Sequence, residues 1–202
     1  MKTYLLLTSL ILLSLIFTQC TSVSTERETL TNVAEDKYHG YKNQIEWGEH
    51  LVVVAGCNDC HTPKKMTAQG PVLDSALWLS GHPAEMPYPD VDRIEMEKKG
   101  YAVTGTLTSW VGPWGVSFAG NLTSDATGIG NWQEENFFTA IREGKFKGIK
   151  SARSLLPPMP WDMYMHFTDD ELKAIFAYLK STKPVNNIVP APIPPASAMA
   201  EK

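Results

Sequence analysis

Two cysteines and a histidine lie together in the stretch Cys57-Asn58-Asp59-Cys60-His61. Thiols at this spacing can close a disulfide, exchange with other thiols, hold a metal ion as thiolates, or add to an unsaturated group as thioethers. An imidazole directly behind the second thiol offers a nitrogen ligand to a metal. The chemistry of this stretch therefore depends on which of these reactions uses all three side chains.

Three of the possible chemistries leave part of the stretch unexplained. A disulfide across two residues closes a tight ring that constrains little of the unfolded chain. A thioredoxin-like dithiol is expected in a βαβ setting, whereas this region indicates a helix followed by a loop. A structural zinc site needs four ligands, and the stretch supplies two thiolates and one imidazole. These three remain as alternatives.

Covalent attachment of haem accounts for all three residues. Two thiols separated by two residues can add to the two vinyl groups of one porphyrin, and the adjacent imidazole then lies under the iron. We therefore expect one covalent haem c, attached through Cys57 and Cys60, with His61 as an axial ligand of the iron.

The region around this stretch resembles the class I c-type cytochromes. The segment GEHLVVVAGCNDCH is similar to the first helix of that family, in which a glycine corresponding to Gly48 meets an aromatic residue corresponding to Tyr178 where the terminal helices cross. QGPVLDS resembles the family's Gly-Pro-x-Leu, which implies that the carbonyl of Pro71 accepts the Nδ1 proton of His61. That bond would make the histidine a more basic iron ligand.

The resemblance extends over roughly residues 44–186, and it implies an all-α protein. The expected fold is that of a small class I cytochrome c, a few helices wrapped around one haem with long loops. GNLTSDATGIGNW and SLLPPMPWDMY are similar to haem domains in cytochrome subunits of bacterial membrane dehydrogenases. Residues 82–114 depart from the family pattern as an insertion. Residues 187–202 form a proline-rich tail that we expect to be extended and without a catalytic role.

A methionine is the expected sixth iron ligand. A thioether is soft and favours Fe(II), so a His/Met pair raises the reduction potential. Met159 stands between two prolines, which restrict the backbone and present the sulfur at little entropic cost. The resemblance assigns the ligand role to the same residue. Met86 is a weaker rival, and we expect Met163 and Met165 to be packing residues.

Three further side chains have two interpretations each. Trp132 and Trp161 could contact the porphyrin, and Arg153 could contact its propionates. Packing within the core accounts equally well for the two tryptophans, and a solvated charge accounts for the arginine.

Two helices must frame the site. For residues 131–144, Asn131 and Glu134 predict a capping box and Gly144 a stop. For residues 168–181, Thr168 and Glu171 predict a second box, followed by an apolar stripe at helical spacing. The composition of residues 62–130 predicts mostly loop.

The amino-terminal residues predict export. One lysine precedes an apolar run over residues 5–17, which is too short to cross a bilayer and fits the h-region of a signal peptide, residues 1–19. Cys20 closes this run and resembles the lipidated cysteine of bacterial lipoproteins, although Phe17-Thr18-Gln19 departs from the usual motif. Residues 20–43 would then be a lipid-anchored flexible tether. The alternative is an ordinary secretory signal that leaves the protein soluble in the periplasm.

The formal net charge is −4 and no basic block is present, so we expect no nucleic-acid partner. The combined interpretation is a non-enzymatic, one-electron carrier, attached to a membrane and facing the periplasm, that exchanges electrons with a redox donor and acceptor. The alternatives are a haem subunit of a dehydrogenase or oxidase complex, and a small haem enzyme or gas sensor with an open sixth position.

Overall fold

The computed structural model describes residues 37–200 of the chain. The predicted signal peptide, Cys20 and the tether as far as residue 36 lie outside the described residues. Contacts divide the chain into Met1–Tyr41 and Lys42–Lys202, and the described residues of the first unit form a turn. Within residues 37–200, no helix combines the length and the apolar character that crossing a bilayer requires.

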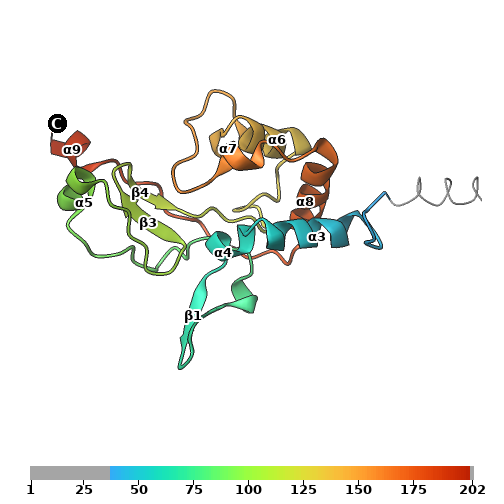
Figure 1. Cartoon of the computed structure of the whole chain (residues 1–202), viewed down its shortest axis with the longest axis horizontal. Helices are drawn as coiled ribbons and strands as arrows, with labels where there is room; N and C mark the ends of the chain where they lie inside the picture. Colours follow the sequence, from blue (N-terminus) through green and yellow to red (C-terminus); the bar gives the residue numbers. More distant parts are fainter. Residues whose placement is uncertain (1–36, 201–202) are drawn as a thin grey trace, which may run out of the picture. The chain divides into compact units, whose positions relative to one another are not determined.

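The unit is built around two helices that cross each other, α3 (Gln44–Val54) and α8 (Asp169–Ser181) (Figure 1). They pack together more extensively than any other helix pair. At the crossing there is no room for a side chain on Gly48, because a Cβ there would lie 1.9 Å from the carbonyl oxygen of Ala174 and 2.9 Å from Cβ of Tyr178. The expected contact between Gly48 and Tyr178 is confirmed.

Helix α8 begins as the sequence predicts. The Thr168 hydroxyl accepts a hydrogen bond from the backbone N–H of Glu171, and the Glu171 carboxylate accepts from the backbone N–H of Thr168 at 2.7 Å. The apolar stripe faces inward: Leu172, Ile175 and Leu179 are buried.

Helix α6 (Glu134–Arg142) is present, but it starts later than expected. Its N-cap is Gln133, whose backbone N–H donates to the side-chain oxygen of Asn136, so the proposed box of Asn131 and Glu134 is wrong. The preceding residues are held in a turn instead, since the Trp132 N–H bonds to the Ile129 carbonyl. The ring of Phe137 stacks on that of Phe176 in α8, with centroids 5.4 Å apart.

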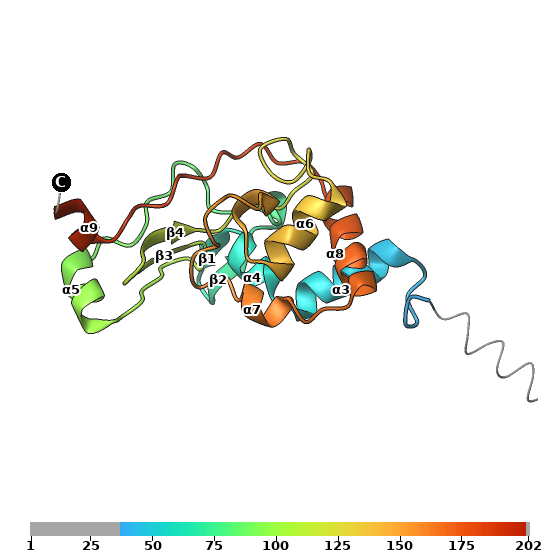
Figure 2. The ribbon, with the colours of Figure 1, turned by 90° about the horizontal axis from the view of Figure 1, so that it is seen from above.

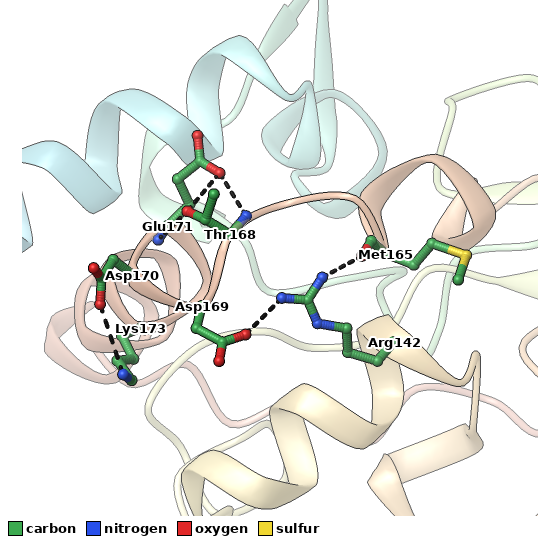
Figure 3. A network of polar contacts seen from close by, with 7 residues as sticks. All are labelled: Arg142, Met165, Thr168, Asp169, Asp170, Glu171 and Lys173. Atoms are coloured by element: carbon green, nitrogen blue, oxygen red, sulfur yellow. Dashed lines mark hydrogen bonds and ion pairs between the residues drawn. The ribbon is translucent and has the colours of Figure 1, made fainter.

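A polar network attaches α6 to the chain between α7 (Trp161–Tyr164) and α8 (Figure 3). The Arg142 guanidinium donates to the backbone carbonyl of Met165 and lies 2.7 Å from the Asp169 carboxylate. One arginine thereby fixes the position at which the chain leaves α7 and enters α8.

Residues 62–130 contain more regular structure than the predicted loop, which corrects that expectation. Two antiparallel hairpins occur there, β1 (Lys64–Thr67) with β2 (Gly70–Leu73) and β3 (Ser109–Gly112) with β4 (Gly115–Phe118). A short helix, α5 (Arg93–Lys99), lies between them, and the 3-10 turns are η1 (Ser75–Leu77) and, later in the chain, η2 (Phe146–Gly148). Strands of four residues are too short to show a clear alternation in the sequence. The described chain is thus mostly helix and loop, with two small sheets.

The proline-rich tail packs against the predicted insertion. Residues 185–194, which we call the C-terminal strap, lead from α8 to the last helix, α9 (Ala196–Ala200) (Figure 2). Ile193 of the strap forms an antiparallel bridge with Val116 in β4, and Ser197 bonds to the Glu97 carboxylate in α5. Residues 185–194 contain no helix and are anchored at several points, whereas Ala196–Ala200 of the predicted tail form α9, so the expectation of an extended tail is wrong for those residues.

Candidate functional site

The two cysteines and the histidine lie on one short helix, α4 (Cys57–His61), directly after α3 (Figure 1). Gly56 joins the two helices with a φ of 71°, a left-handed conformation that glycine adopts without strain. Cys57 and Cys60 are free thiols, both partly buried. Residues three apart on a helix lie on the same face, so the backbone presents the two thiols side by side.

Both thiols are held in the uncharged form near neutral pH. Burial raises the pKa of Cys57 to about 12, and burial also raises the pKa of Cys60. Neither thiol is therefore activated as a thiolate nucleophile in this environment. In residues 37–199 no three or more His, Cys, Asp or Glu side chains gather in a metal-binding arrangement.

The ring of His61 is oriented by a backbone carbonyl. Its Nδ1 lies 2.7 Å from the carbonyl oxygen of Gly120. A carbonyl can only accept, so Nδ1 carries the proton and Nε2 of the neutral ring keeps its lone pair. Burial lowers the pKa of His61, which favours this neutral form. The structure thus provides an imidazole with a defined tautomer and a nitrogen able to bind iron.

The partner of His61 is Gly120 and not Pro71, which corrects the role expected for Pro71. In the structure Pro71 is an exposed residue of β2, paired with Met66 of β1. The Gly-Pro-Val-Leu stretch forms β2, one strand of the first hairpin. Gly120 is the first residue of GNLTSDATGIGNW, the segment that resembles known haem domains, but nothing in that segment marks its carbonyl as the partner of His61.

Two chain segments that contact His61 also bond to each other. The Gly81 N–H donates to the His61 carbonyl at 2.8 Å, and the His82 N–H donates to the Ala119 carbonyl at 2.9 Å. A Cβ on Gly81 would lie 2.6 Å from atoms of Ala119 and Gly120, so only glycine permits this approach. Sequence reasoning did not single out Gly81 or Gly120.

Met159 lies in the loop before α7 and is partly buried. Its carbonyl accepts a hydrogen bond from the Trp161 N–H at 3.0 Å. Helix α7 is joined to the turn before α4, because the Tyr164 hydroxyl donates to the Ala55 carbonyl at 2.5 Å. The helix that follows Met159 is therefore bonded to the chain just before Cys57. The ligand role of Met159 stays a prediction.

The other methionines differ in their surroundings. Met163 and Met165 are 68% and 37% exposed, so the expectation that they pack inside is wrong. Met163 belongs to α7 and Met165 is its C-cap. Met86 is partly buried, and its carbonyl accepts from Nε2 of His82 at 2.8 Å.

The three aromatic and basic candidates have structural contacts of their own. Trp161 fills the space beside Gly144, where a Cβ would lie 2.4 Å from the indole. The guanidinium of Arg153 stacks 4.1 Å above the ring of Phe146. The carbonyl of Trp132 lies 3.5 Å from the Lys180 ammonium. The contacts of Trp161 and Arg153 account for the positions of those two side chains, the contact of Trp132 concerns its backbone, and roles of all three toward the haem stay predictions.

The donor set fits a covalent haem. Two uncharged thiols lie one helical turn apart, and the neighbouring imidazole is fixed with its Nε2 lone pair available. These are the groups that two thioether bonds and one axial bond to iron require.

Comparison with known proteins agrees with this chemistry. No family model matches the chain. It is 30% identical over 151 residues to the cytochrome c subunit of an alcohol dehydrogenase (quinone) from Gluconacetobacter polyoxogenes, which is 72% of this chain and 26% of that protein. It is 28% identical over 149 residues to the fructose dehydrogenase cytochrome subunit from Gluconobacter japonicus, 72% of this chain and 23% of the relative.

A third relative matches a shorter region. The gluconate 2-dehydrogenase cytochrome c subunit from Pantoea cypripedii is 36% identical over 67 residues, 33% of this chain and 14% of that protein. The chain spans about a quarter of the length of the first two relatives. Its homologues are thus cytochrome subunits of bacterial dehydrogenases, and this similarity supports a haem domain of the cytochrome c kind.

Proposed function

We propose that this protein carries single electrons through one covalently bound haem c and works with, or as a subunit of, a bacterial dehydrogenase. The observation that carries the proposal is the arrangement of Cys57, Cys60 and His61 on α4 with the His61 ring oriented by Gly120. The names of the relatives support the same role, because each denotes a cytochrome subunit of a dehydrogenase.

The residues of the chain have separate tasks in this proposal. The Cys57 and Cys60 sulfurs would form the two thioether bonds, and Nε2 of His61 would bind the iron. When bound, the haem supplies an iron that cycles between Fe(III) and Fe(II). The thioether of Met159 would be the second protein ligand and would favour Fe(II). A filled sixth position leaves no place for a substrate, so the domain transfers electrons and performs no bond chemistry.

The proposal includes attachment to a membrane on the periplasmic side. Its support is the short apolar run closed by Cys20, followed by a polar segment. Lipidated Cys20 would hold the haem domain at the surface on which a membrane dehydrogenase works. Two or more acyl chains bind a bilayer stably, whereas one chain binds marginally.

Covalent attachment is tested by extracting the haem. Native protein should keep its haem through acid–acetone extraction, whereas the Cys57→Ala, Cys60→Ala double variant should release whatever haem it binds. Cys20→Ser is the matched control, since it removes the third cysteine and should leave the covalent attachment of the haem intact. Native protein that loses its haem on extraction would contradict the proposal.

The choice between carrier and enzyme is tested by optical spectra of the native protein. Oxidised and reduced spectra should be those of a six-coordinate, low-spin haem, and carbon monoxide should change the reduced spectrum little. Ready binding of carbon monoxide would instead favour an enzyme or gas sensor with an open sixth position.

A further inference from the structure

The C-terminal strap meets the two segments that hold His61, and Asn187 is the residue at that meeting point. Its side-chain amide donates to the carbonyl of Ser80 at 2.8 Å and to the carbonyl of His82 at 2.9 Å. Its side-chain oxygen accepts from the Ala84 N–H at 3.1 Å. A single amide therefore bonds to three backbone groups on one side of His61.

The backbone groups that Asn187 binds flank the residue that contacts His61. Ser80 is 1% and His82 0% exposed, so their carbonyls would be left without water if the amide were removed. Between them lies Gly81, whose N–H bonds to the His61 carbonyl. The position of Gly81 against α4 thus depends on bonds that Asn187 makes on either side.

The strap also holds the segment that carries Gly120. Asn121 donates through its amide to the Val185 carbonyl at 2.8 Å. The backbone N–H of Ile193 donates to the Val116 carbonyl, and the N–H of Val116 donates to the Ile193 carbonyl. Val116 lies in β4, the strand that leads to Gly120. Gly115 permits this pairing, because a Cβ there would lie 2.0 Å from the Ile193 carbonyl oxygen. The strap therefore contacts both segments that bond to His61, the one that meets its backbone carbonyl and the one that meets its ring.

We propose that Asn187 is a positioning residue for the iron ligand His61, acting through Gly81 and Gly120. The inference rests on the proposed function, since it takes His61 as the ligand. A strong bond from Nδ1 to the Gly120 carbonyl makes the imidazole more basic and stabilises the ferric state. Loss of the amide of Asn187 should let the two segments separate, weaken that bond and raise the reduction potential.

The test compares Asn187→Ala with Asn186→Ala in the full-length protein carrying its haem. Asn186 is the same residue type one position earlier, but it is exposed and bonds to Asp125. Asn187→Ala should keep its covalent haem and raise the potential, whereas Asn186→Ala should match the native value. Asn187→Ser, a milder change, should shift the potential in the same direction if the alanine variant folds poorly.

A second measurement separates positioning from a general loss of stability. In protein with isotope-labelled histidine, the Nδ1 proton of His61 should exchange with solvent about tenfold faster in Asn187→Ala, as expected for a loss of one or two hydrogen bonds. An unchanged potential with unchanged exchange, or equal shifts in both variants, would overturn the inference. If the native protein holds no covalent haem, the proposed function fails, and the exchange rates still decide whether Asn187 positions His61.

Discussion

The hydroxyl of Tyr164 lies 2.5 Å from the carbonyl oxygen of Ala55, across 109 residues of sequence. Ala55 immediately precedes the glycine turn into α4, and Tyr164 ends the helix that follows Met159. This bond joins the end of α7, the helix that follows Met159, to the end of α3, next to the helix that carries His61. Two side chains that bind one iron need such a connection, because the ligand on a loop must be held at a fixed distance from the other ligand.

Removing this hydroxyl should weaken the fold. Tyr164→Phe keeps the ring and leaves the Ala55 carbonyl without its donor, so the free energy of unfolding should fall by about 1 kcal/mol at neutral pH. Urea denaturation followed by circular dichroism measures this difference. Tyr101→Phe is the control, because that ring is 57% exposed and its change should leave stability unaltered.

The same hydroxyl should give stability a dependence on alkaline pH. Burial raises the pKa of Tyr164 to about 12, above the ordinary value near 10. The neutral phenol is therefore favoured by folding. Its contribution is fully present below about pH 10 and is lost as the pH rises through about 12. Tyr164→Phe should remove that part of the dependence, and equal alkaline profiles for variant and native protein would contradict the assignment.

The crossing of α3 and α8 should not tolerate a side chain at Gly48. Gly48→Ala places a Cβ against the Ala174 carbonyl and forces the two helices apart, which should cost about 1–3 kcal/mol. Thermal unfolding measures the loss. Gly105→Ala is the control, because the nearest atom to its Cβ would be 4.0 Å away. A native-like melting temperature for Gly48→Ala would mean that the helices do not cross there.

The ligand role of Met159 has a spectroscopic test. Ferric native protein should show the weak near-infrared charge-transfer band expected of sulfur ligation, and Met159→Ala should lose it. The variant should also bind carbon monoxide and have a lower reduction potential, because the soft ligand that favours Fe(II) is gone. Met86→Ala, Met163→Ala and Met165→Ala should each keep the band. A band that persists in Met159→Ala would assign the sixth ligand elsewhere.

Lipid attachment at Cys20 predicts the distribution of the protein between fractions. Native protein should sediment with membranes, and Cys20→Ser should lose the lipid and appear in the soluble periplasmic fraction. Mass spectrometry of the mature amino terminus checks the chemistry directly. An unmodified mature protein that starts at another residue would rule out the anchor.

Local patterns determined much of this protein from its sequence alone. The spacing of Cys57, Cys60 and His61 places three reactive groups on one helix wherever that helix lies. The start of α8 at Thr168 and its buried stripe follow from residues within a few positions of one another. The crossing at Gly48 also follows from the sequence. A glycine within an apolar helix permits another helix to approach closely, and the family resemblance names Tyr178 as its partner.

Contacts between distant residues were decided by the tertiary structure. The partner of His61 is the carbonyl of Gly120, 59 residues away, and every residue has a carbonyl, so no side chain marks the one that is used. The four-residue strands of β3 and β4 and the attachment of the strap at Asn187 depend likewise on which segments meet. Backbone hydrogen bonds of this kind form only when folding has brought the segments together, and the sequence carries no local pattern for them.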